Sequence, residues 1–110
     1  VRTLECCSGD LADLKVKSCD VEAFSPRQNK YFEVGSCSIL GDAQARRLGI
    51  RMKTKNGNEY VTTLNNTVLA TPRGLIAFLE NNVNEDGSVN IPEVLRPYMG
   101  GKEKLTPKSW

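Results

Sequence analysis

The chain has 110 residues, a length that suits one domain or a piece of one. Hydrophobic residues make up 39% and charged residues 25%, which is ordinary for a folded globular protein and argues against disorder. The 15 Lys and Arg residues barely outnumber the 13 Asp and Glu residues, so the net charge of +2 predicts no broad attraction to nucleic acid or membranes. Histidine is absent, which excludes histidine-based triads and histidine-ligated zinc. No apolar run approaches the roughly 20 residues of a membrane-spanning helix, so no membrane partner is expected.

The N-terminal part of the chain predicts short strands separated by turns. Residues 2–7 form the first expected strand, and a brief helix over 11–14 follows, with Asp10 as its cap. Residues 19–24 alternate apolar and polar side chains with the two-residue period of a half-buried strand. A short turn then leads to another strand over 30–38, which predicts an antiparallel hairpin.

The middle of the chain predicts a second hairpin. Residues 41–49 are polar and basic, and they precede an expected strand over 50–53. The dipeptide Asn56-Gly57 is the strongest short hairpin signal available, and it predicts a return strand over 59–65.

A helix is expected to begin at Thr71 and Pro72, because Thr can cap a helix and Pro suits its first position. Four apolar residues then form a stripe at helical spacing: Leu75, Ile76, Leu79 and Val83. Residues 91–98 contain two prolines, so only a short irregular helix is expected there.

These elements predict an α+β fold, because hairpins joined to amphipathic helices show no β-α-β alternation and favour an antiparallel sheet. We assign residues 1–99 to one structural unit and residues 100–110 to a polar, loose C-terminal tail. The sequence begins at Val1, within a strand-like segment, so we expect a fragment of a longer protein.

The four cysteines follow no metal-binding spacing, because none of Cys6, Cys7, Cys19 and Cys37 forms a C-x-x-C pair. We expect free buried thiols, as in the reducing cytosol, and a cytoplasmic location. A disulfide framework or a metal site is the alternative.

Arg73 is a candidate anion-binding residue, because it lies two residues past the expected helix cap. A cation in the first turn opposes the helix dipole, which indicates either a solvated side chain or a guanidinium that grips a phosphate together with free helix N–H groups.

Asn65 and Thr67 are candidate ligand-binding residues at the end of the strand that leads to this helix. In an extended chain they share a face, and they offer an amide and a hydroxyl to one small polar ligand. The alternative is turn chemistry, since Asn and Thr are common where strands end.

Glu33 is a candidate metal ligand in the middle of the 30–38 strand. A carboxylate there faces either solvent or a site, and a hard cation such as Mg²⁺ beside phosphates would be the functional reason to keep it. Gly35 would suit the close approach of a ligand or a bulge. The adjacent Arg46 and Arg47 favour a surface or salt-bridged pair over nucleic-acid binding.

Several segments together resemble the seryl-tRNA synthetases among the class II aminoacyl-tRNA synthetases. The run TLNNTVLATPR at 63–73 resembles the third signature motif of class II, and LIAFLEN at 75–81 continues it in the seryl style. Further similar segments are CSGD at 7–10, DAQARRLGIR at 42–51, EDGSV at 85–89 and IPEVLRPYM at 91–99.

The resemblance implies the C-terminal part of a class II catalytic domain over residues 1–99. It implies activation of serine by ATP to seryl-adenylate with Mg²⁺, then transfer to tRNA(Ser), in a full-length parent that is a homodimer. Arg73 is similar to the arginine that holds the ATP γ-phosphate. Glu33 and Ser36 correspond to the residues that bind ATP through the metal, and Asn65 and Thr67 to those that recognise serine.

Glu33 and Ser36 are an odd number of residues apart, so they can share a face only if the strand contains a bulge, which we expect at Gly35. The chain departs from the family pattern at Ile39, Thr62 and Asn66, so the alternative function is a non-catalytic interaction module. In either case we expect the isolated chain to be inactive, because the first two class II signatures are not present in it.

Overall fold

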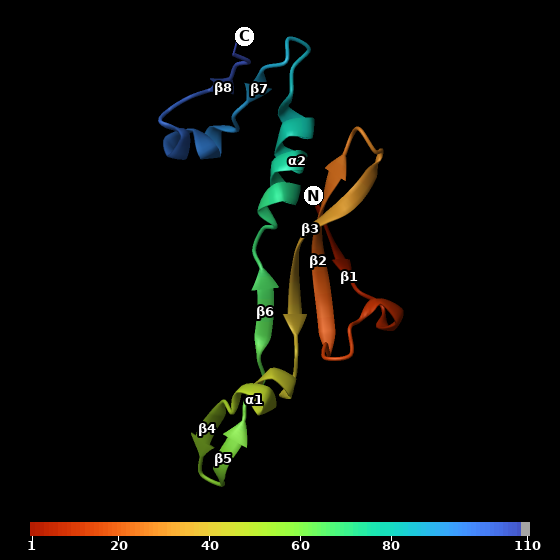
Figure 1. Cartoon of the computed structure of the whole chain (residues 1–110), viewed down its shortest axis with the longest axis vertical. Coiled ribbons are helices and arrows are strands. Elements are labelled where there is room, and N and C mark those ends of the chain that lie inside the picture. The colour runs from red at the N-terminus through yellow and green to blue at the C-terminus, as the bar shows by residue number, and fades with distance from the viewer. Residues whose placement is uncertain (109–110) are drawn as a thin grey trace.

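The computed structural model describes residues 1–108 and shows an elongated molecule (Figure 1). Its extents are 66 × 34 × 24 Å and its radius of gyration is 20.0 Å, whereas a compact domain of this length has a radius of about 13 Å. A central sheet lies in the middle, a small hairpin extends from one end, and a helix with a second small hairpin lies toward the other end. Most of the chain is therefore close to the surface.

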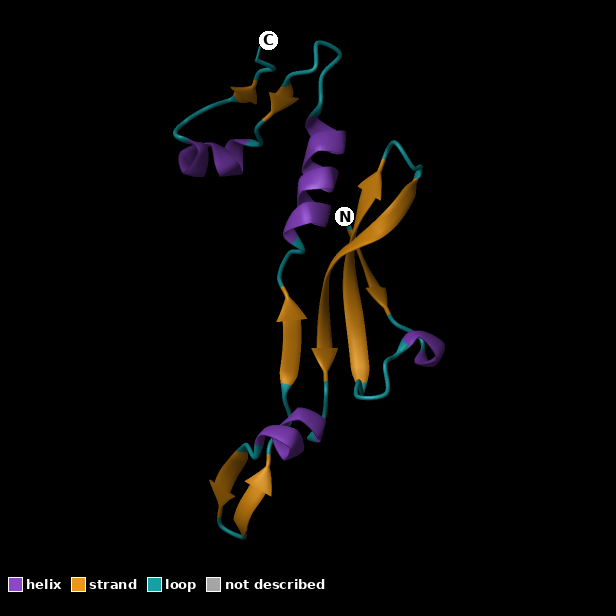
Figure 2. Ribbon diagram, viewed as in Figure 1, coloured by secondary structure: helices purple, strands orange, loops and turns teal. Residues whose placement is uncertain are grey.

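The central sheet has four antiparallel strands in the order β1-β2-β3-β6 (Figure 2). The strands are β1 Arg2–Glu5, β2 Lys17–Ser25, β3 Lys30–Ile39 and β6 Leu64–Thr67. The predicted α+β fold with an antiparallel sheet is confirmed, and so is the predicted hairpin between β2 and β3.

A separate hairpin consists of β4 Arg51–Thr54 and β5 Gly57–Tyr60, and α1 Ala43–Leu48 precedes it. The predicted hairpin is confirmed, although its two loop residues are Lys55 and Asn56, and Gly57 opens the return strand with a φ of 117°. The expected single return strand over 59–65 is wrong. The chain leaves the hairpin after Tyr60 and pairs with β3 of the central sheet instead.

Two helical predictions need correction near the chain's N-terminus and at the main helix. A 3₁₀ turn, η1, covers Ser8–Asp10, so Asp10 ends a helical turn and does not cap one over 11–14. The main helix, α2, covers Thr71–Asn82, and its N-cap is Ala70, without a capping side-chain hydrogen bond. Pro72 therefore occupies the second helical position, where its missing N–H costs nothing.

The C-terminal region pairs β7 Val89–Asn90 with β8 Lys104–Leu105, and a 3₁₀ helix, η2 Glu93–Met99, lies between them. The irregular helix was predicted. The expectation of a loose tail is wrong for Lys104 and Leu105, while residues 109–110 of that tail lie outside the described part of the chain.

The core is small. Only six hydrophobic residues are buried within residues 1–108: Ala23, Val34, Leu40, Ala45, Val89 and Ile91. The apolar stripe predicted for α2 is exposed, and Leu75 keeps 55% of its surface. All four cysteines are free, as expected, but none is buried: Cys6 and Cys19 are half-buried, and Cys7 and Cys37 are exposed. No helix among the described residues is long and apolar enough to cross a membrane.

Candidate functional site

A β-bulge in β3 brings Glu33 and Ser36 to one face of the central sheet. Glu22 of β2 pairs with Glu33, and the next β2 residue, Val21, pairs with Gly35, so Val34 is the extra residue. Ser36 pairs with Asp20, which lies two residues from Glu22 and therefore on the same face. The bulge required by the odd spacing is present, one residue earlier than the expected position at Gly35.

Strand β6 adds Asn65 and Thr67 to this face. Thr67 pairs with Ser36, and Asn65 pairs with Ser38. Because directly opposed residues of an antiparallel pair project to the same side, Asn65, Thr67 and Ser36 share one side of the sheet. We call Glu33, Ser36, Asn65 and Thr67 the polar face.

Gly35 permits the close approach of β6 to the bulge. A Cβ atom at Gly35 would lie 2.7 Å from the carbonyl oxygen of Thr67 and 3.0 Å from that of Val68. Such distances are not tolerated between a side chain and backbone, so the absent side chain makes room for backbone and not for a ligand. A backbone hydrogen bond also joins the segment before α2 to β3, because the Ala70 N–H donates to the Val34 carbonyl at 2.7 Å.

Arg73, in the first turn of α2, reaches back to the polar face. Its Nη1 lies 3.4 Å from Oε2 of Glu33 and 3.3 Å from the Glu33 carbonyl oxygen. The Arg73 and Glu33 side chains keep 55% and 42% of their surface, so this ion pair is open to water and weak. A ligand with more negative charge can therefore compete for the guanidinium.

The electrostatics at the start of α2 favour an anion. The helix has no side-chain cap and no acidic residue in its first turn, so its N–H groups and the positive end of its dipole are not neutralised there. Arg73 adds a full positive charge at the same end. Phosphate oxygens fit both kinds of donor.

Two acidic residues beside the polar face were not identified as site residues from the sequence. By register, Asp20 and Glu22 lie next to Ser36 and Glu33. Glu22 is paired with Arg2 at 2.5 Å, and Asp20 accepts a hydrogen bond from the Cys6 thiol at 3.3 Å. Desolvation, together with Asp20, raises the pKa of the Cys6 thiol. The alternation over 19–24 carried the signal for this acidic edge, but it was interpreted only as the period of a half-buried strand.

The polar face is open. No enclosed pocket forms among residues 1–108, and no group of three or more acidic or cysteine side chains there is arranged to hold a metal ion. Glu33 and Ser36 nevertheless supply a carboxylate and a hydroxyl on the same side. Mg²⁺ commonly takes one or two such protein ligands and completes its shell with water and phosphate oxygens, so these residues fit that ion.

The twin arginines lie away from the polar face, on α1. Arg46 pairs with Asp42 at 2.7 Å, and its guanidinium lies 4.6 Å from the centre of the Tyr60 ring. Arg47 is exposed. The ion pair supports the expectation of a salt-bridged surface pair at Arg46.

Known proteins similar to this chain agree on one family. A family model described as the tRNA synthetase class II core domain (G, H, P, S and T) matches residues 2–82. The serine–tRNA ligase of Mesorhizobium japonicum is 52% identical over 109 residues, which is 97% of this chain and 25% of that protein. The serine–tRNA ligase of Laribacter hongkongensis is 51% identical over 97% of this chain, again 25% of the protein.

Solved structures give the same result. The seryl-tRNA synthetase of Pyrococcus horikoshii, complexed with ATP, matches with a TM-score of 0.90 and 44% identity, over 98% of this chain and 24% of that one. The cytoplasmic serine–tRNA ligase of Naegleria fowleri, in complex with AMP, matches with a TM-score of 0.85 and 38% identity, over 98% of this chain and 26% of that one. The chain thus spans about a quarter of the relatives it matches. It belongs to the class II tRNA synthetase core-domain family, and its relatives named above are serine–tRNA ligases.

Proposed function

We propose that this chain forms part of the ATP and serine site of a serine–tRNA ligase, the enzyme that activates serine as seryl-adenylate and transfers it to tRNA(Ser). One observation carries the proposal. Arg73, in the first turn of α2, lies beside Glu33 of the central sheet. The sheet places Ser36, Asn65 and Thr67 on the same side as Glu33.

Arg73 and the start of α2 bind the terminal phosphates of ATP. The pair with Glu33 is weak and open to water, so it leaves the guanidinium free to bind phosphate. Charge neutralisation and positioning are the main requirements of this chemistry. The serine carboxylate is already ionised at neutral pH, so it attacks the α-phosphorus and releases pyrophosphate without a base. The lack of histidine is therefore no obstacle.

Glu33 and Ser36 would hold Mg²⁺, which supplies charge neutralisation between the phosphates when bound. Asn65 and Thr67 recognise serine, because an amide and a hydroxyl can hydrogen-bond its ammonium, carboxylate and hydroxyl groups. These roles rest on the shared side of the sheet and on the family to which the chain belongs.

The whole ligase is proposed to work in the cytoplasm, as a homodimer that binds tRNA(Ser). The chain spans 25% of the Mesorhizobium enzyme, so the adenine site, the tRNA-binding surface and the dimer contacts are assigned to other parts of such an enzyme. The isolated chain is expected to be inactive for the same reason.

The test is a hybrid ligase, in which this chain replaces the matched quarter of the Mesorhizobium japonicum enzyme. Serine-dependent exchange of pyrophosphate into ATP is expected from the hybrid, because the polar face and Arg73 are complete. A hybrid that folds, as shown by its melting temperature, but lacks exchange would contradict the proposal. It would favour the non-catalytic interaction module, with Ile39, Thr62 and Asn66 as the first positions to revert toward the family pattern.

A further inference from the structure

Helix α2 is not held in place by a hydrophobic core. None of its twelve residues is fully buried; Leu75, Ile76 and Leu79 are exposed, and only Ala77 and Phe78 among its apolar side chains are half-buried. Packing of an apolar face normally fixes a helix on a sheet. Within the described residues, polar contacts must therefore do much of that work for α2.

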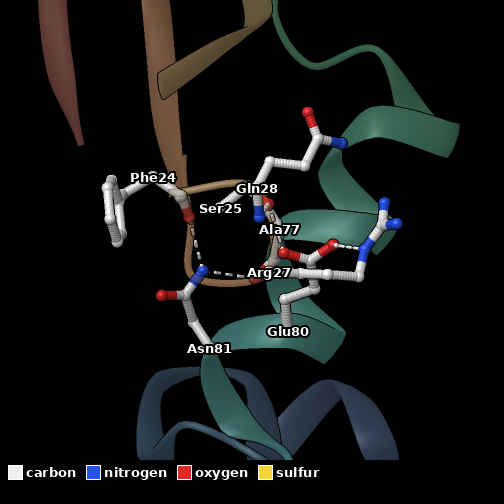
Figure 3. Close-up of polar contacts among 7 residues, drawn as sticks. All are labelled: Phe24, Ser25, Arg27, Gln28, Ala77, Glu80 and Asn81. Atoms are coloured by element: carbon white, nitrogen blue, oxygen red, sulfur yellow. Dashed lines mark hydrogen bonds and ion pairs between the residues drawn. The ribbon is translucent and has the colours of Figure 1, made fainter. Parts of the chain in front are cut away.

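A dense set of such contacts joins the C-terminal half of α2 to the end of β2 (Figure 3). The Ser25 hydroxyl, which is fully buried, donates to Oε2 of Glu80 at 2.5 Å and accepts the Gln28 N–H at 3.2 Å. The Asn81 amide donates to the Phe24 carbonyl at 2.9 Å. Figure 3 shows both α2 side chains turned toward the same stretch of the β2–β3 hairpin. We call Ser25, Glu80 and Asn81 the clamp.

The Glu80 carboxylate in the clamp has a partner for each oxygen, Ser25 for one and Arg27 for the other. The Ser25 hydrogen bond, followed by contacts with Arg27, holds the pKa of Glu80 below its ordinary value. The Glu80 side chain is only 15% exposed, whereas Arg27, 3.1 Å away, is 70% exposed. Ser25 is therefore the main partner, and Arg27 lies on the outside of the contact.

The clamp and the site lie on the same rigid helix. Arg73 and Glu80 are seven residues apart, which is about 10 Å along a helix. The hairpin that receives Glu80 and Asn81 also contains Glu33, the partner of Arg73. A rigid helix fixed at one end has its other end fixed as well, so the clamp sets the position of the Arg73 guanidinium over the polar face.

We propose that Glu80, Asn81 and Ser25 are positioning residues that hold Arg73 where the terminal phosphates of ATP bind. This inference rests on the proposed function for the role of Arg73. The positional part can be tested without ATP, so the two can fail separately.

The first measurement is hydrogen exchange in the hybrid ligase without nucleotide. Glu80→Ala and Asn81→Ala are expected to speed exchange in peptides spanning residues 68–74, because the Ala70 N–H bond to β3 loosens when α2 shifts. Asn82→Ala is the matched control, since within residues 1–108 the Asn82 amide donates to Phe78 of its own helix and to no other element. Exchange at 68–74 that stays at the parent rate in both clamp variants would overturn the inference.

The second measurement separates the substrates. Each clamp variant is expected to raise the KM for ATP about threefold or more, with the KM for serine unchanged, because misplacement affects the phosphate contact. In an Arg73→Ala background the clamp substitution should add nothing, as expected for residues that act through Arg73. A clamp substitution that raises the KM for ATP in the Arg73→Ala background as much as it does in the parent would overturn the inference. If Arg73→Ala itself leaves the KM for ATP unchanged, the proposed function fails, and the exchange result alone decides whether the clamp fixes the helix.

Discussion

The two ends of α2 attach to the same hairpin in opposite ways. At the N-terminal end, one nitrogen of Arg73 lies 3.4 Å from the carboxylate of Glu33, and both side chains are about half exposed. At the C-terminal end, Glu80 and Asn81 make hydrogen bonds of 2.5 and 2.9 Å to β2, and Ser25 is fully buried. At the loose end the Arg73 side chain keeps its charge available for a ligand, and the tight end, together with the Ala70–Val34 backbone bond, supplies the rigidity.

The difference shows how one short helix can both present a free charge to a ligand and stay fixed on the sheet. A strong contact at Arg73 would have to be broken before a phosphate could bind, and breaking it would cost affinity. A weak contact at Glu80 would let the helix shift on the sheet, and the Arg73 guanidinium would no longer be held at the phosphate position. Dividing the two tasks between the ends of one helix avoids both problems.

The largest expected effect comes from removing the loose contact. Arg73→Ala in the hybrid ligase should lower kcat/KM for ATP by about a hundredfold, because a charged donor to the phosphates is lost. The melting temperature should hardly change, since an exposed ion pair contributes little stability. Arg47→Ala is the control, an exposed arginine away from the polar face. A large drop in melting temperature for Arg73→Ala would show that both ends of the helix are structural.

The second effect tests the close backbone packing of residues 67–68 against Gly35, next to the N-terminal end of α2. Gly35→Ala should destabilise the fold by about 1–3 kcal/mol, because its new methyl group would meet the Thr67 and Val68 carbonyls. We expect a lower melting temperature and a loss of exchange activity together. Gly9→Ala is the matched control, since nothing lies within 4 Å of a Cβ at Gly9. Equal melting temperatures for the two variants would mean that β6 can shift freely against the bulge.

The smallest effect is a pH dependence at the tight end. Because the folded protein holds the pKa of Glu80 below its ordinary value, the resulting stability is complete above the ordinary pKa and is lost as the pH falls through the lowered one. The hybrid should melt above its Glu80→Gln variant at neutral pH, and the two should converge in acid. A constant difference across that range would show that the charge of Glu80 is not what stabilises the clamp.

Much of the architecture could be predicted from local patterns. Alternation over 19–24 predicted β2, the Asn56-Gly57 signal predicted the β4–β5 hairpin, and Pro72 marked the start of α2. The family resemblance pointed to Arg73 and the polar face, and the structure brings these residues to one region. Their roles in binding remain predictions.

The errors arose where tertiary pairing decided the outcome. The return strand was expected to run through 59–65, but Leu64 and Asn65 pair with β3, and no local signal distinguishes the two partners. The apolar stripe of α2 was predicted from its helical spacing, but that spacing does not show whether a covering surface is present, and the stripe is exposed. The clamp was missed because Ser25 and Glu80 are 55 residues apart.

The unpaired Val34 makes the arrangement of the site sensitive to a single peptide unit. If β3 paired with β2 in strict alternation, with no bulge, Glu33 and Ser36 would project to opposite sides of the sheet, because they are three residues apart. Every side chain named for the chemistry would still be present in such a chain. Counting identities in an alignment would miss the loss, whereas the register of β3 against β2 would reveal it.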